Sequence, residues 1–311
     1  MILRKIFNPV AVIRYMRAEL AASLLLSAGV WYLYYSRHLE KASLPFSVAA
    51  ILGSALAIFI AFRNNNAYGR WWEARTLWGS IVNSSRIFAR QVIANAADAA
   101  ATGKVPQEQA DAYARELVLR QIAFAHALRL HLRREADAEA LRPLLPPGEF
   151  ERAAASQNIP NALLFAQGMR IKEGVRLGIL GAFDNISLEP TLASFSTFQG
   201  GCERIKNTPL LRQYHFFTKL FLLVFMAVLP FSLIGDFARM GAASLMVPVS
   251  VLISFVFGVM GRVGEVNEDP FENRITDVPM TALCNTIERD LKEMAGLDLP
   301  ASVLPARGFL A

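Results

Sequence analysis

Few residues of this 311-residue chain combine the types and spacing that chemistry requires. Two of its four histidines, His126 and His131, lie five positions apart, so a helix would point them to different faces, whereas helical metal ligands four apart share a face. The sequence holds no phosphate-binding glycine loop, no dinucleotide motif and no HExxH zinc motif. We therefore expect that the chain is not an enzyme.

The densest acidic stretch, near the C-terminus, contains Glu268, Asp269, Glu272 and Asp277. Carboxylates can bind calcium, but Arg274 lies among these and their spacing is not that of an EF-hand loop. The alternative is that these residues cap helices and pair with basic side chains. Calcium at this cation-binding loop is the one cofactor that the sequence suggests, and we expect the protein to need none.

The composition indicates which elements must position any site. Hydrophobic residues make up 54% of the chain and charged residues 19%, against about 45–50% and about 25% in ordinary soluble domains. The apolar excess lies in four runs, at residues 20–35, 44–62, 220–235 and 241–261. About 20 apolar residues in a helix cross a bilayer. We therefore predict an all-α polytopic membrane protein with four transmembrane helices; the alternative for the two shorter runs is a buried helix of a soluble protein.

Basic residues near the ends of these runs predict the orientation, because cytoplasmic loops are rich in lysine and arginine. They cluster beside the N-terminus and the middle segment, at Arg4, Lys5, Arg14, Arg17, Arg63, Arg70, Arg75, Arg212, Lys219 and Arg262. The two short loops hold fewer, namely Arg37, Lys41 and Arg239. We expect a multi-pass protein of the inner (plasma) membrane with both termini in the cytoplasm. The net charge of +6 then faces anionic lipid, and no nucleic-acid partner is expected.

The middle of the chain reads as a cytoplasmic helical region. Helical periodicity predicts helices over residues 76–100, 106–134, 160–182 and 189–206, with a Gly-Lys-Val-Pro break at 103–106. We divide the chain into residues 1–62 with two spans, 63–219 as the helical region, 220–261 with two more spans, and 262–311 as a helix and a Pro-broken tail over 299–311. Cys202 and Cys284 fall on the cytoplasmic side, where a disulfide is not expected.

The second apolar run carries a regular stripe. Ser54, Ile58 and Phe62 recur every four residues, and the run contains no charge. On a single helix such a stripe is explained by ordinary packing. Several copies around an axis would instead form a ring of apolar side chains, which can gate a pore by dewetting. The scarcity of ionisable residues in the spans argues against an ion-coupled transporter.

The residues that follow this stripe resemble the bestrophin family, and in particular its bacterial branch. The segment FRNNNAYGRWWEARTLWGS occupies residues 62–80, and IAFAHALRL (122–130), GCERI (201–205) and EDPF (268–271) follow in the family's order. The resemblance implies a homopentameric ion channel with one central pore. It also implies that Ser54, Ile58 and Phe62 line the hydrophobic neck of this pore and that Ile186 forms its cytoplasmic aperture.

The same resemblance implies which ions the channel conducts. Animal bestrophins conduct chloride and other small anions, whereas the bacterial branch includes a cation-conducting member. We expect small monovalent anions to permeate; the alternatives are a Na⁺/K⁺ channel and a non-conducting scaffold or receptor. Ser54 replaces the usual bulky apolar residue of the neck. The acidic run of the animal members is thinned here to Glu272, Asn273, Arg274 and Asp277, so calcium control is not expected.

Overall fold

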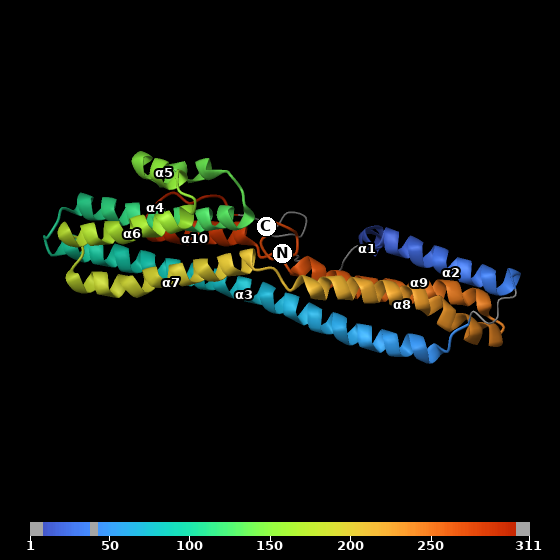
Figure 1. The fold of residues 1–311 in the computed structure, drawn as a ribbon. Coiled ribbons are helices and arrows are strands. Elements are labelled where there is room, and N and C mark those ends of the chain that lie inside the picture. The colour runs from blue at the N-terminus through green and yellow to red at the C-terminus, as the bar shows by residue number, and fades with distance from the viewer. Residues whose placement is uncertain (1–8, 38–42, 303–311) are drawn as a thin grey trace. The chain divides into compact units, whose positions relative to one another are not determined.

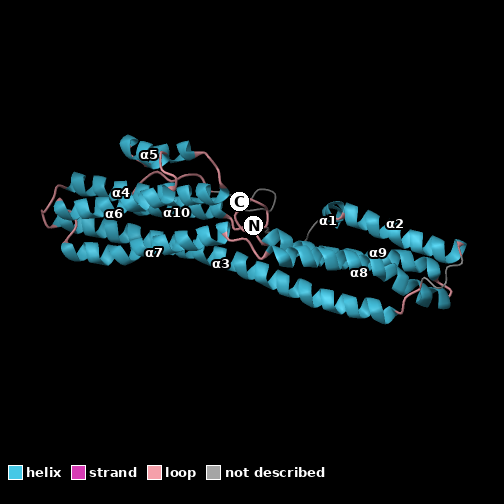
Figure 2. Ribbon diagram, viewed as in Figure 1, coloured by secondary structure: helices cyan, strands magenta, loops and turns pink. Residues whose placement is uncertain are grey.

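The computed structural model describes residues 9–37 and 43–302, and every regular element within these ranges is a helix, as the sequence predicts (Figures 1 and 2). The elements are α1 (Pro9–Tyr15), α2 (Arg17–Ser36), α3 (Phe46–Ala101), α4 (Gln107–Arg133), η2 (Ala138–Leu144), α5 (Pro147–Ala154), α6 (Ile159–Arg176), α7 (Ala182–Asn207), α8 (Arg212–Arg239), η3 (Ala243–Leu245), α9 (Met246–Asn267) and α10 (Met280–Met294). The predictions that concern Arg4, Lys5, Lys41 and the tail over 303–311 lie outside the described residues.

The chain divides into two compact units. Of the described residues, those up to Arg70 and Pro209–Glu268 form the apolar unit, and Trp71–Thr208 together with those from Asp269 onward form the bundle unit. These units begin and end at other residues than our four segments, whose boundaries refer to a membrane and stay a prediction.

In the apolar unit, α2, α8 and α9 pack against one another. The face that α9 turns inward consists of small residues, Ser250, Ser254, Gly258, Gly261 and Gly264, all buried. Small side chains at spacings of three and four allow helices to approach closely. The Ser23 hydroxyl of α2 donates a hydrogen bond to the Ser254 hydroxyl of α9 over 3.0 Å, which fixes the contact between these two helices.

Among the described residues, three helices are long and apolar enough to cross a membrane: Phe46–Ala101, Arg212–Arg239 and Ala243–Asn267. They correspond to three of our four predicted spans, at 44–62, 220–235 and 241–261. The fourth predicted span, residues 20–35, lies within the helix α2 but is not one of these three. The last span was expected to begin at residue 241. Its helix α9 starts at Met246 instead, because Gly241 adopts a left-handed conformation and η3 follows.

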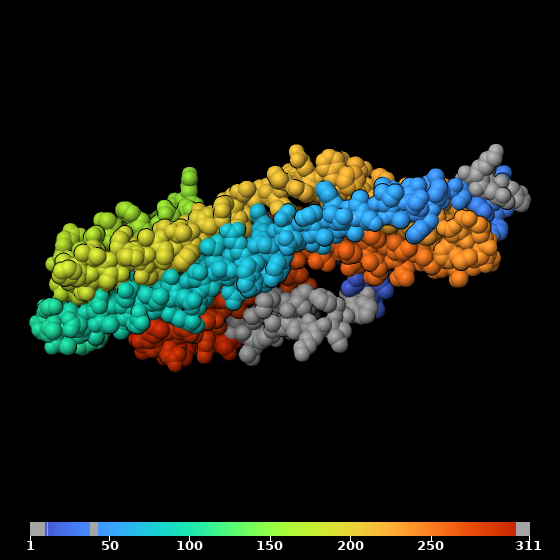
Figure 3. All heavy atoms as spheres, turned by 90° about the horizontal axis from the view of Figure 1, so that it is seen from below, coloured from blue at the N-terminus to red at the C-terminus, as the bar shows by residue number. Residues whose placement is uncertain are grey.

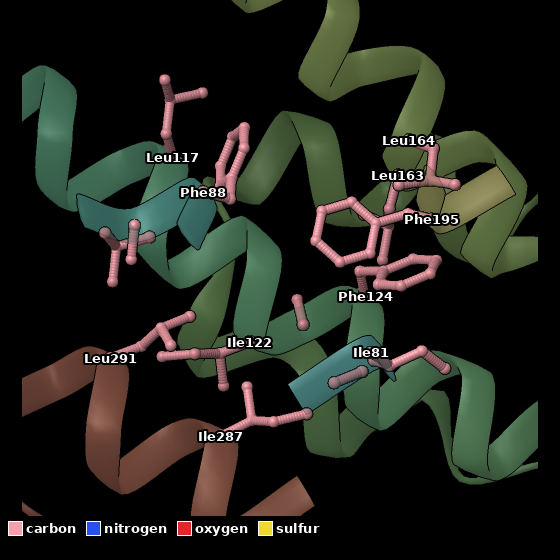
Figure 4. Close-up of a cluster of buried hydrophobic side chains, with 14 of the residues drawn as sticks. Ile81, Phe88, Leu117, Ile122, Phe124, Leu163, Leu164, Phe195, Ile287 and Leu291 are labelled. Atoms are coloured by element: carbon pink, nitrogen blue, oxygen red, sulfur yellow. The ribbon is translucent and has the colours of Figure 1, made fainter. Parts of the chain in front are cut away.

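The bundle unit has its own hydrophobic core. α4 contacts α6, α7 and α10. The Phe195 ring lies 5.5 Å from the Phe124 ring and 6.2 Å from the Phe88 ring, the latter edge to face. Ile122 of α4 belongs to the same cluster as Ile287 of α10 (Figure 4). The helix predicted over 106–134 is confirmed as α4, and the break at 103–106 separates it from α3.

Three boundaries within the predicted helical region were wrong. The helix predicted over 160–182 ends at Arg176, because the chain turns at Gly178, which adopts a left-handed conformation. The second apolar run and the helix predicted over 76–100 form one helix, α3, because no proline or turn interrupts the charged stretch between them. The helix predicted over 189–206 begins at Ala182, so Pro190 lies inside α7. A proline removes one helical hydrogen bond but need not end a helix. The Asp184 carboxylate accepts a bond from the Gly181 N–H and caps the true start.

Candidate functional site

The stripe on α3 is uncovered in a single copy of the chain. Ser54 is exposed, and Ile58 and Phe62 expose 59% and 63% of their surface. The opposite side of the same helix buries Leu56 and Ile60 completely or nearly so. Figure 3 shows the surface of this part of α3 in light blue. The stripe is therefore not explained by packing within one chain.

Contacts behind the stripe hold it in place. The Phe59 ring lies 5.6 Å from the ring of Tyr214 and 5.6 Å from that of Phe221, both on α8. On the stripe itself, the Ser54 hydroxyl donates a hydrogen bond to the Ala50 carbonyl over 2.8 Å. Since this bond occupies the hydroxyl proton, the serine adds little polarity to an otherwise apolar face.

A buried ion pair follows the stripe directly. Arg63 is 3% exposed, and its Nε and Nη2 donate to one oxygen of Glu268 over 2.9 and 2.6 Å. Nη2 also lies 2.9 Å from Nδ1 of His215, so this guanidinium joins α3, α8 and the end of α9. Sequence reasoning missed this pair, because its members are 205 positions apart. The available signal was a single cation immediately after an uncharged apolar run.

Further charges lie near this pair in the apolar unit. Arg262 donates to Glu19 over 2.6 Å and to Glu265 over 3.0 Å. Its guanidinium also lies 5.2 Å from the centre of the Tyr15 ring, a cation–π contact. These interactions connect the start of α2 to the end of α9.

Ile186, the residue matched to the aperture, lies on α7 of the bundle unit. It exposes 65% of its surface, and the neighbouring Phe183 exposes 85%. This part of α7 therefore presents an apolar patch that the described residues of the chain leave uncovered.

The acidic residues have separate partners. Glu268 pairs with Arg63, and Glu272 pairs with Lys206 over 2.6 Å. Asp277 is buried and accepts bonds from the backbone N–H groups of Glu272 (2.7 Å) and Arg274 (3.1 Å), which closes the turn at Asn273. Burial raises the pKa of Asp277 despite these bonds. No group of three potential metal ligands occurs among the residues that the structure describes.

The two histidines of α4 are likewise separated. His126 lies 3.1 Å from Glu288, and His131 lies 3.6 Å from Glu203. The hydrogen bond from His126, together with that from Lys292, lowers the pKa of Glu288 to about 2. Each imidazole thus has a carboxylate of its own, as expected for structural contacts.

Both cysteines are free and buried, Cys202 on α7 and Cys284 on α10. The Cys284 thiol donates to the Ala125 carbonyl over 3.3 Å. Burial raises the pKa of both thiols to about 12.

Comparison with known proteins adds a family match. Residues 5–293 match the model of a family described as bacterial/fungal bestrophin protein. The match covers nearly the whole chain, including the three helices of its described part that are long and apolar enough to span a membrane.

Curated relatives and solved structures agree with this match. The chain is 36% identical over 280 residues to the voltage-dependent anion channel-forming protein YneE of Escherichia coli K12, covering 90% of this chain and 85% of that protein. It is 33% identical over 270 residues to the protein RSc3414 of Ralstonia nicotianae, which has the same descriptive name. That alignment covers 86% of this chain and 81% of the relative. The crystal structure of a bacterial bestrophin homologue from Klebsiella pneumoniae superposes with a TM-score of 0.81 at 30% identity, covering 91% of this chain and 99% of that one.

Proposed function

This chain belongs to the bacterial and fungal bestrophin family, and on that premise we propose that it forms an ion channel for small monovalent anions. The relatives from E. coli and R. nicotianae are named as voltage-dependent anion channel-forming proteins. We further propose that five copies surround one central pore and that each contributes its α3 to the wall. Closed rotational symmetry lets one helix per copy complete such a wall.

The observation that carries the proposal is the uncovered stripe of Ser54, Ile58 and Phe62. An apolar face in a membrane can contact lipid, but this one lies on the helix that continues directly into Arg63 and its buried ion pair. Turned toward a common axis, the stripe would form a narrow apolar neck. Such a neck carries no fixed charge and would control flux through its hydration.

The proposed arrangement in the inner membrane includes α2 as a fourth span, with both termini in the cytoplasm. Exposed aromatic residues at the far end of α2 support this assignment. Trp31, Tyr32 and Tyr35 expose 37%, 54% and 45% of their surface, as expected for side chains in the interfacial region of a bilayer.

The reversal potential of the purified protein in a planar bilayer under a KCl gradient tests the ion. A value near the chloride equilibrium potential supports the proposal. A value near the potassium potential would replace it with a cation channel, which an uncharged neck also permits. The absence of any current would favour a scaffold or receptor.

Substitutions in the stripe test the neck. Ile58→Ala and Phe62→Ala should each raise the conductance or the open probability. Each variant replaces a large apolar side chain of the neck with a methyl group in every subunit, and so widens the dry constriction. Leu252→Ala is the matched control: Leu252 is an apolar residue of α9 that is 61% exposed and lies off the stripe. Unchanged currents in both stripe variants would remove the neck assignment.

A further inference from the structure

We propose that Asn65 forms a binding site for the permeant anion immediately after the neck, with the side-chain amide donating hydrogen bonds to the ion as it leaves the apolar ring. The inference rests on the proposed channel function and extends it to one further residue. It concerns the apolar unit alone, to which both the stripe and Asn65 belong.

Asn65 lies on nearly the same face of α3 as the stripe. Successive residues of an α-helix are rotated by about 100°. On this basis Asn65 points about 20° away from the mean direction of Ser54, Ile58 and Phe62. The next residue, Asn66, points about 80° away, and the preceding one, Asn64, about 120° away. Asn65 therefore continues the stripe, whereas its two neighbours leave it.

Hydrogen bonding agrees with these directions. The Asn64 amide donates to the Met260 carbonyl of α9 over 2.9 Å, so Asn64 points inward. Asn65 is exposed and has no hydrogen-bond partner among the described residues. Its amide is the first polar side chain on this face whose donors are not engaged, since the Ser54 hydroxyl donates to its own helix.

An ion that crosses an apolar ring has lost part of its hydration shell and is stabilised by the first polar groups that replace the water. An asparagine amide offers two N–H donors and one carbonyl acceptor. Five copies would surround the ion with a ring of donors, without a fixed charge that would trap it.

The surrounding charge favours an anion over a cation. In the described part of the apolar unit, the residues around the start of α2, the Arg63 pair and the end of α9 carry more basic than acidic side chains. The basic ones are Arg14, Arg17, Arg63, Arg70, Arg212, Lys219 and Arg262, and the acidic ones are Glu19, Glu265 and Glu268. This excess creates a positive potential, which raises the local concentration of anions and favours the amide orientation that points N–H toward the ion.

The test compares two adjacent asparagines in the full-length protein in planar bilayers. Asn65→Ala removes the amide from all five subunits and should lower the single-channel chloride conductance by about 10-fold or more, because even one hydrogen bond to a charged group is worth at least about that factor. Asn65→Gln, which keeps the amide, should recover most of that conductance. Asn65→Asp should shift the reversal potential under a KCl gradient toward the potassium value. Asn66→Ala and Asn66→Asp are the matched controls and should stay close to the unmodified channel.

Two results would overturn the site. One is an equal effect of the Asn65 and Asn66 substitutions; the other is a conductance of Asn65→Ala that equals that of the unmodified channel. Because Asn65 has no partner within the described chain, its variants should keep the helix content and oligomeric size of the unmodified protein, which circular dichroism and size-exclusion chromatography check. If the conductance rises in Ile58→Ala but is unchanged in Asn65→Ala, the result refutes this site alone. The absence of current in the unmodified protein would refute the proposed function.

Discussion

Separating the Arg63–Glu268 pair should destabilise the apolar unit, and the two single variants should differ. Glu268→Met leaves a guanidinium that is 3% exposed without its carboxylate. Removing one partner of a buried ion pair costs about 3–5 kcal/mol. Arg63→Met leaves a carboxylate whose side chain is 17% exposed and can reach water. For this second variant we expect a smaller loss, of about 1–3 kcal/mol, typical of an unsatisfied polar group.

The double variant Arg63→Met/Glu268→Met provides the decisive comparison. It removes both charges, and replacing a buried pair with apolar residues is often neutral or stabilising. We therefore expect it to be more stable than Glu268→Met, with a coupling free energy of about 2 kcal/mol or more between the two sites. The free energy of unfolding would be measured by circular dichroism as the SDS fraction of mixed micelles is raised.

A surface pair in the same unit supplies the control. Arg239 and Asp236 are paired at the end of α8, but their side chains are 80% and 41% exposed. The coupling free energy between these two residues should be about 0.2–1 kcal/mol, as is typical of exposed ion pairs. Strictly additive losses at Arg63 and Glu268, or a coupling no larger than that of the surface pair, would refute the reasoning.

Three further predictions concern the bundle unit. Ile186→Ala should change the permeability ratios between small and large anions, measured from bi-ionic reversal potentials; identical ratios would leave the aperture unsupported. Because the pKa of Glu288 is lowered to about 2 by the hydrogen bond from His126, its contribution to stability is complete above about pH 4.5 and is lost as the pH falls toward 2. In Glu288→Gln, the free energy of unfolding should therefore fall less steeply with pH over that range than in the unmodified protein, as measured by acid unfolding followed by circular dichroism. Gly174→Ala should cost about 1–3 kcal/mol in thermal unfolding, since its new methyl group would collide with both the hydroxyl and the ring of the buried Tyr113; an unchanged stability would contradict this close contact.

Periodicity along one helix was the most reliable guide to this structure. The spacing of Ser54, Ile58 and Phe62 placed them on one face, and all three are exposed there. Hydropathy misled at the end of that run. Hydropathy falls where charged residues begin, but a helix can continue through charged residues. Sequence reasoning therefore missed the continuation of α3 past Arg63. The partner of Arg63 could not be predicted, because its position depends on how α3 packs beside the end of α9.

The two buried thiols have a consequence for labelling experiments. Thiol reagents attack the thiolate, and at neutral pH neither Cys202 nor Cys284 is ionised or reachable. We therefore expect that maleimides and methanethiosulfonates do not react with the unmodified chain. A single Ser54→Cys or Ile58→Cys substitution would introduce the one fast-reacting group. Its rate of modification, measured from either side of the bilayer, would report water access along α3 without any need to remove the native cysteines.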